Sequence, residues 1–159
     1  WNENRLVPDI SKSTINKSKV KIRNPNAIRP WQHILEIINA FLLIIIQKKT
    51  KILSKPQILN IAPNFKSNIR VIDLINLITK EDVFKKVNYK ITQKKYFENK
   101  ILRLSGLNAK NKIKFTPKLN LKKTVKLTSD WYHAFNKKQN MFNYTCTQIK
   151  EYFYDFKKI

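Results

Sequence analysis

Residues 22–36 read Ile-Arg-Asn-Pro-Asn-Ala-Ile-Arg-Pro-Trp-Gln-His-Ile-Leu-Glu. Arginine is scarce in this chain, with 5 against 28 lysines, yet Arg23 and Arg29 both lie in this stretch. Pro30 favours an extended backbone at Arg29, and a planar guanidinium matches the geometry of phosphate at any working pH. The stretch therefore predicts either a site for a fixed anion such as a pyrophosphate or an arginine that packs on Trp31 and bonds to nearby carbonyls.

The longest apolar run of the chain, residues 34–46, follows directly and contains only two polar residues, Glu36 and Asn39. As a helix it would be roughly 20 Å long, whereas the hydrocarbon layer of a membrane is roughly 30 Å thick. The run therefore predicts a buried core helix over 34–48 and no membrane span. His33, just before it, is expected at the end of a buried strand, where core packing is favoured over chemistry.

The rest of the chain alternates between strand and helix patterns, which predicts a small mixed α/β domain. Val71, Leu74, Ile75 and Ile78 follow helical spacing, with Ser67 or Asn68 as the cap. Further helices are expected from Pro8 or Asp9 to Asn16, over 106–112, after the cap Asn120 to Phe135, and over 145–156. Strands are expected over 20–23, 58–62, 87–91 and 101–104, and an extended segment over 28–32.

A length of 159 residues with 42% apolar content suits one domain with a core. The first residue is Trp1, so we expect a piece of a longer chain. Cys146 is the only cysteine, which excludes an internal disulfide and fits a reducing, cytoplasmic compartment. His33 and His133 lie far apart in sequence, so no metal site is predicted.

The formal net charge is +23 and the isoelectric point about 10.2, which points towards an anionic partner. Lysines are spread along the whole chain, whereas glycine and arginine are rare. Nucleic-acid binders usually employ arginine as well, because it reads guanine edges with two bonds. A bias towards AT-rich codons explains the composition, and we favour it over selected nucleic-acid binding.

Residues 22–36 closely resemble a signature of the CDP-glucose 4,6-dehydratases, which are NAD-dependent nucleotide-sugar enzymes of the extended short-chain dehydrogenase/reductase superfamily. Residues 1–9, Trp-Asn-Glu-Asn-Arg-Leu-Val-Pro-Asp, resemble the segment that precedes this signature. Residues 59–64 resemble the family's Asn-Phe-Gly-Pro-Asn turn, residues 102–115 its strand, helix and Gly-Trp turn, and Trp131-Tyr132 its late aromatic helix. The resemblance spans nearly all of the chain and is most specific in the first 36 residues.

The resemblance implies a set of substrate contacts. Arg29 matches an arginine that binds the diphosphate, Arg5 and Leu6 match the loop that closes over the nucleotide, and Ile22 matches the edge that flanks the base. Asn68 aligns roughly with a diphosphate-binding asparagine. From the residues alone, Ile22 also reads as a plain strand residue and Asn68 as a helix cap.

The family is also expected to need a glycine-rich turn that binds NAD. Gly106 is the only glycine here, so the chain resembles the carboxyl-terminal, substrate-binding part alone, with the dinucleotide-binding (Rossmann) half absent and NAD bound by that missing amino-terminal half. The implied reaction is a lyase reaction that converts CDP-glucose to CDP-4-keto-6-deoxyglucose, a precursor of surface deoxysugars such as those of lipopolysaccharide O-antigen. We expect the complete enzyme to be a homo-oligomer and this chain alone to be inactive.

No catalytic, cofactor-binding or metal-binding residue is assigned. The family's proton-transfer pair, Tyr-x-x-x-Lys, matches at 96–100 and 154–158, but six tyrosines and 28 lysines among 159 residues give about one match by chance. Both matches also follow the substrate motif, whereas the family's pair precedes it. Two rivals remain: a basic module that binds nucleic acid or an anionic surface, and a related nucleotide-sugar enzyme with another base.

The chain departs from the family pattern at three positions. Ala62 and Lys114 replace glycines, and Ser105 replaces the aspartate that ends a strand. If those glycines held positive φ angles, each replacement would cost roughly 1 kcal/mol or more.

Overall fold

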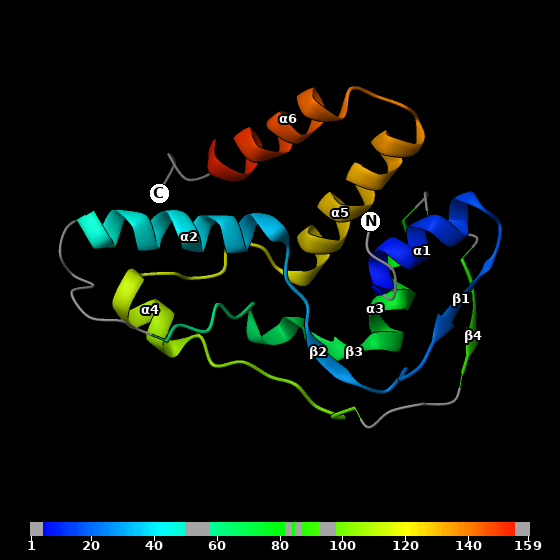
Figure 1. The fold of residues 1–159 in the computed structure, drawn as a ribbon, viewed down its shortest axis with the longest axis horizontal. Coiled ribbons are helices and arrows are strands. Elements are labelled where there is room, and N and C mark those ends of the chain that lie inside the picture. The colour runs from blue at the N-terminus through cyan, green and yellow to red at the C-terminus, as the bar shows by residue number, and fades with distance from the viewer. Residues whose placement is uncertain (1–4, 50–57, 82–83, 85–86, 93–97, 155–159) are drawn as a thin grey trace. The chain divides into compact units, whose positions relative to one another are not determined.

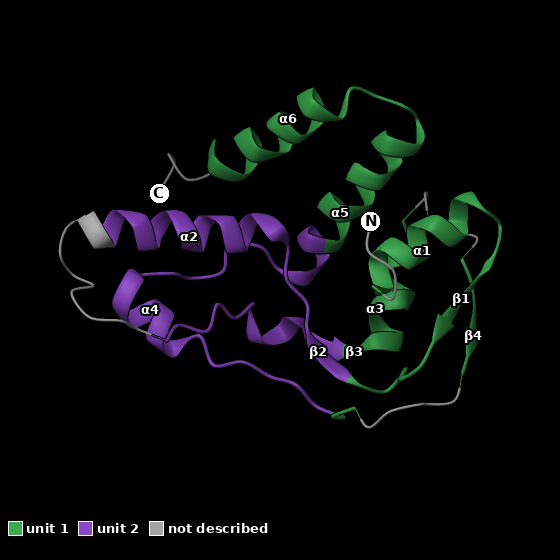
Figure 2. Ribbon diagram, in the orientation of Figure 1, with its two compact units in different colours: residues 1–27, 70–100, 125–159 green, residues 28–69, 101–124 purple. Residues whose placement is uncertain are grey.

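The computed structural model describes residues 5–49, 58–81, 84, 87–92 and 98–154, whose elements are labelled in Figure 1. The chain divides into two compact units, coloured in Figure 2. Unit 1 comprises Trp1–Ala27, Arg70–Lys100 and Val125–Ile159, and unit 2 comprises Ile28–Ile69 and Ile101–Thr124.

Unit 1 combines helices with a two-stranded parallel sheet. Its elements are α1 (Leu6–Ile15), β1 (Lys19–Ile22), α3 (Val71–Ile78), β4 (Asn88–Ile91), most of α5 (Leu121–Asn136) and α6 (Met141–Tyr154). Strand β1 pairs with β4, with Lys19 opposite Asn88 and Ile22 opposite Ile91. Val20 and Ile22 are buried, whereas Lys19 and Lys21 are exposed. Side chains alternate between the two faces of a strand, so the apolar face of β1 packs on the core and the lysine face meets solvent.

Side-chain hydrogen bonds join α5 to α6. The indole Nε1–H of Trp131 donates to Thr145 Oγ1 at 3.0 Å, and the buried Gln148 donates from Nε2 to the carbonyl of Leu127 at 2.8 Å. The indole N–H of Trp131 and the amide of Gln148 thus have hydrogen-bond partners where they are shielded from water, so both side chains can pack between α5 and α6.

Unit 2 contains β2 (Ile28–Pro30), α2 (Ile34–Lys49), the 3₁₀ turn η1 (Phe65–Ser67), the start of β3 (Asn68–Arg70) and α4 (Leu107–Ile113). Helix α2 packs on α4 through a small core of Ala40, Ala109, Ile113 and Phe115, flanked by Leu43, Ile44, Leu59 and Ile61. A Cβ on Gly106 would lie 3.2 Å from the Cβ of Ala62, so the glycine allows a close approach there.

The predicted fold class, small mixed α/β, is confirmed. Every predicted helix forms, although α1 begins earlier, at Leu6, and α6 begins earlier, at Met141. The predicted strand over 58–62 is wrong, because its apolar residues pack on the α2–α4 core without a partner strand. The predicted strand over 101–104 reduces to a single bridge at Ile101.

The cap predicted for α3 is also wrong. Arg70 is the N-cap of α3 and offers no side-chain cap bond, while Asn68 lies in β3 and Ser67 in η1. Asn68 pairs with β2 as part of an extended strand, so it does not cap α3.

Helix α2 is buried on one face only, whereas the sequence predicted a buried core helix. Ile34, Ile38, Phe41 and Ile45 are 62%, 40%, 56% and 54% exposed, and they lie four, three and four residues apart. We call these four residues the α2 seam. The neighbouring Leu42 and Ile46 are exposed as well, so the helix presents an apolar surface of the kind that packs against another helix or sheet.

One of the family's glycine positions does hold a left-handed backbone. Lys114 ends α4 with φ 57° and ψ 24°, as expected for a glycine replaced by lysine. Lys17 and Lys138 also have positive φ, at 50° and 55°, beyond the ends of α1 and α5. Ala62 does not, so the expectation of strain there is wrong.

Candidate substrate-binding site

Strand β2 lies between two other extended segments. The N–H of Val71 donates to the carbonyl of Ala27 at 2.9 Å, and that of Trp31 to the carbonyl of Ser67 at 3.2 Å. As the residue number rises along β2, the number of the partner residue falls, so β2 and β3 run antiparallel. In this register Arg29 lies opposite Ile69, and Pro30 lies opposite Asn68.

On its other edge β2 meets the segment that begins at Ile101. Ile28 forms a parallel bridge with Ile101, and the N–H of Leu102 donates to the carbonyl of Ile28 at 3.1 Å. Because side chains alternate along a strand, Arg29 shares a face with its partner Ile69. The opposite face carries Asn68 and Pro30.

Arg29 is half-buried, and its Nη1 donates to the carbonyl of Ile28 at 2.8 Å. This bond agrees with the alternative interpretation of the sequence, in which Arg29 bonds to nearby carbonyls. A guanidinium carries five N–H donors, so one bond to a carbonyl does not exclude an anion. The bond limits the rotation of the side chain, which suits an arginine that meets its ligand in one orientation.

Trp31 fixes the strand that carries Arg29. Its backbone N–H donates to the carbonyl of Ser67, the last residue of η1, and its indole Nε1–H donates to the carbonyl of Ile69 in β3 at 3.1 Å. The tryptophan thus has a structural role, because it holds β2 to the η1–β3 segment at the position next to Pro30.

His33 occupies the N-cap position of α2. Its Nδ1 accepts from the N–H of Leu35 at 3.3 Å, and its carbonyl accepts from the N–H of Glu36 at 3.1 Å. Burial lowers the pKa of His33 to about 4. The ring is therefore neutral near pH 7, and its role is the structural one favoured from the sequence.

Glu36 is a buried carboxylate whose function the sequence did not indicate. Its Oε1 accepts from the backbone N–H groups of Lys118 and Leu119 at 2.8 and 2.6 Å. Its Oε2 is buried and has no hydrogen-bond partner in the described part of the chain. Burial lowers the pKa of Lys118, and the charge of Glu36 partly opposes this. The carboxylate ties the start of α2 to the segment that leads into α5.

Asn68 lies on the face of the ribbon opposite Arg29. Its Nδ2 donates to the carbonyl of Phe65 at 2.9 Å, which closes the η1 turn. Its Oδ1 is buried with no partner among the residues the structure describes. The pairing therefore brings Asn68 and Arg29 onto neighbouring strands but on different faces, and a shared diphosphate contact stays a prediction.

The remaining predicted contacts, Arg5, Leu6 and Ile22, belong to unit 1. Arg5 is an exposed, extended N-cap of α1, and Leu6 is the first residue of that helix instead of part of a loop. Ile22 is 2% exposed at the end of β1, and its carbonyl accepts from the N–H of Thr92 at 2.9 Å. This burial is typical of a structural strand residue.

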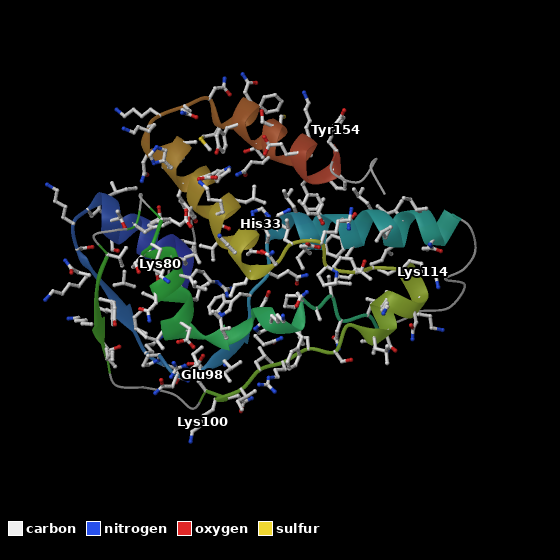
Figure 3. The ribbon with its side chains drawn as sticks, turned by 180° about the vertical axis from the view of Figure 1, so that it is seen from behind. His33, Lys80, Glu98, Lys100, Lys114 and Tyr154 are labelled. Carbon is white, nitrogen blue, oxygen red and sulfur yellow. The ribbon has the colours of Figure 1, made fainter. Side chains whose placement is uncertain are left out.

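The two Tyr-x-x-x-Lys matches fall partly outside the described residues, since Tyr96 and Lys158 are not described. Lys100 is exposed, and Tyr154 is exposed at the end of α6 (Figure 3). Within the described ranges, no three His, Cys, Asp or Glu side chains gather in a way that could hold a metal ion. No helix in the same part of the chain is long and apolar enough to cross a membrane.

Comparison with known proteins gives a short sequence match to a nucleotide-sugar enzyme. No family model matches the chain. Over 44 residues the chain is 48% identical to the CDP-glucose 4,6-dehydratase of Salmonella typhimurium (strain LT2), and the match covers 28% of this chain and 12% of that protein.

Solved structures resemble most of the fold. The UDP-glucose 4-epimerase of Stenotrophomonas maltophila, solved with NAD and formylated UDP-arabinopyranose, matches with a TM-score of 0.72 at 14% identity. The UDP-glucuronic acid 4-epimerase of Bacillus cereus, solved with UDP-glucuronic acid and NAD, matches with a TM-score of 0.67 at 13% identity. Both matches cover 85% of this chain and 41% of the solved chain, so this chain spans less than half the length of these structures. The chain therefore shares the fold of part of these nucleotide-sugar epimerases, and over 44 residues it resembles CDP-glucose 4,6-dehydratase in sequence.

Proposed function

We propose that this chain is the substrate-binding part of a CDP-glucose 4,6-dehydratase. The observation that carries the proposal is the 48% identity to such an enzyme over 44 residues, together with the arginine of that signature, Arg29, held on a fixed strand. The solved structures, at 13% and 14% identity, support the fold alone. The choice of reaction rests on the sequence.

In this proposal Arg29 binds the diphosphate of CDP-glucose with charge-assisted hydrogen bonds. Arg5 and Leu6 close over the nucleotide from the start of α1, Ile22 flanks the base, and Asn68 provides a weaker diphosphate contact. The overall reaction is loss of water from CDP-glucose to give CDP-4-keto-6-deoxyglucose. NAD, held by a dinucleotide-binding half, would supply reversible hydride transfer to this reaction.

NAD and the proton-transfer residues are assigned to a dinucleotide-binding half outside these 159 residues. More than half of each matched epimerase chain lies outside the match, and the α2 seam presents the apolar surface that such a half would cover. Assembly of the complete enzyme into a homo-oligomer stays a prediction.

The test is to express this chain together with the dinucleotide-binding half of the Salmonella enzyme and to assay CDP-glucose with NAD. Formation of the keto-sugar, detected by its absorbance in alkali, is the expected result, and neither half alone should produce it. Turnover by this chain alone would overturn the division of roles. Equal turnover of UDP-glucose would instead favour the rival reading, a related enzyme with another base.

A further inference from the structure

A second arginine, which the resemblance does not assign, follows the bridge to β2. Arg103 lies two residues after Ile101, which is bridged to Ile28. Its guanidinium lies 5.6 Å from the centre of the Phe65 ring. Arg103 makes no ion pair with any side chain that the structure describes, so its charge is not neutralised there.

Phe65 is 73% exposed. The turn is held at both ends: Asn64 Oδ1 accepts from the N–H of Lys66 at 3.1 Å, and Asn68 Nδ2 donates to the carbonyl of Phe65 at 2.9 Å. The ring is therefore presented to solvent by a closed turn, with Arg103 over it and the exposed Lys66 beside it.

We propose that Phe65 and Arg103 form a stacking site for an unpaired base of single-stranded nucleic acid. An exposed ring and a planar guanidinium offer faces on which a base can stack, and stacking of this kind tolerates every base. Lys66, the next residue along the chain after Phe65, is an exposed cation that we assign to the adjoining phosphate. The net charge of +23 favours a polyanion over a single nucleotide, because each further phosphate gains from the same positive field.

A duplex does not fit this site as well, because its bases are already stacked and paired. This inference uses Phe65 and Arg103, neither of which is assigned to the CDP-glucose site.

The experiment measures binding of a fluorescent oligo(dT) of about ten nucleotides, within the usual range of site sizes, by anisotropy. Phe65→Ala and Arg103→Ala should each weaken binding about 5- to 150-fold, the range expected for the loss of one stacked base. Arg103→Lys should recover only part of the loss, because it keeps the charge but not the planar face.

The chain offers matched controls. Phe142 on α6 is 77% exposed with no cation over its ring in the described structure, and Lys110 is an exposed cation on α4. Phe142→Ala and Lys110→Ala should leave the affinity close to that of the unaltered chain. If all four alanine variants weaken binding alike, the general positive charge accounts for it and the site is wrong. Equal binding of CMP and the oligonucleotide would also overturn the inference.

Discussion

Glu36 on α2 accepts a hydrogen bond from the backbone N–H of Leu119 at 2.6 Å, across more than eighty residues of sequence. The same oxygen accepts from the N–H of Lys118, and the side chain is 1% exposed. The pair couples the helix that follows Arg29 to the segment that starts α5. A buried carboxylate with two donors is costly to remove, because the donors lose their partner away from water.

Glu36→Ala should therefore lower the free energy of unfolding by about 3 kcal/mol, the magnitude of one to two charge-assisted bonds. Hydrogen exchange at the amides of Lys118 and Leu119 should accelerate more than exchange elsewhere in unit 2. Glu151→Ala, at an exposed glutamate of α6, is the control and should be nearly neutral. Unchanged protection of the Leu119 amide would show that the bond does not stabilise this segment.

His33 predicts a pH dependence of stability. Because burial lowers its pKa from 6.5 to about 4, the folded state binds fewer protons than the unfolded state between these values. The contribution is complete above about pH 6.5 and is lost as the pH falls towards 4, amounting to at most about 3 kcal/mol. Urea unfolding between pH 4 and 7 measures this.

His33→Asn provides the matched variant for that prediction, since asparagine is a good N-cap but does not titrate in this range. The stability of this variant should fall less steeply towards acid than that of the unaltered chain. His133→Gln, at the exposed histidine of α5, should leave the slope unchanged. If the pH dependence of stability changes in the His133 variant and not in the His33 variant, His33 is not the residue responsible.

Lys114 predicts a stabilising substitution. A lysine with φ 57° carries a steric cost of about 1 to 2 kcal/mol that glycine avoids, although glycine also loses more freedom on folding. Lys114→Gly should therefore raise the free energy of unfolding by about 0.5 to 1 kcal/mol. Lys110→Gly, inside the same helix, should lower it by a similar amount, and thermal melts of the two variants give the comparison.

Helices were well predicted from sequence because their hydrogen bonds are local. The spacing of Val71, Leu74 and Ile78 already defines α3, and Asn120 caps α5 as predicted, accepting from the N–H of Lys123 at 2.9 Å. Strand β3 was missed because its extended state depends on Trp31, a distant partner. Residues 58–62 were misread for the same reason: their apolar pattern shows burial, and a pattern alone does not reveal whether a partner strand exists.

The candidate site was also predicted from sequence only where a local signal marked the residue. Arg29 stands out in the sequence because arginine is rare and Pro30 follows it, and the structure places it on β2 as an extended residue. The pairing of Arg103 with Phe65 has no local signal, since it depends on the bridge between Ile28 and Ile101. The scarcity of arginine was the one clue that could have marked Arg103.

The α2 seam predicts the behaviour of the isolated chain. A contiguous apolar stripe on the surface promotes association and binds hydrophobic dyes. Ile45→Lys should reduce dye binding and raise the soluble concentration, with a change in unfolding free energy below about 0.5 kcal/mol because the residue is exposed. Ile91→Lys, at an isoleucine of β4 that is 64% exposed, is the control. If both variants act equally, the seam is not a special surface.

Arg29 is the residue on which the proposed substrate site depends. In the enzyme restored with a dinucleotide-binding half, Arg29→Ala should weaken CDP-glucose binding by about 10- to 150-fold, since a hydrogen bond to a charged group contributes roughly 1.5 to 3 kcal/mol. Arg29→Lys should recover part of this loss, because a point charge cannot make the bidentate contact. NAD binding should not change. Arg23→Ala removes an exposed charge six residues away and should leave CDP-glucose binding nearly intact in calorimetry. If Arg23→Ala weakens binding as much as Arg29→Ala does, Arg29 contributes only to the general positive field and the assignment of the site is wrong.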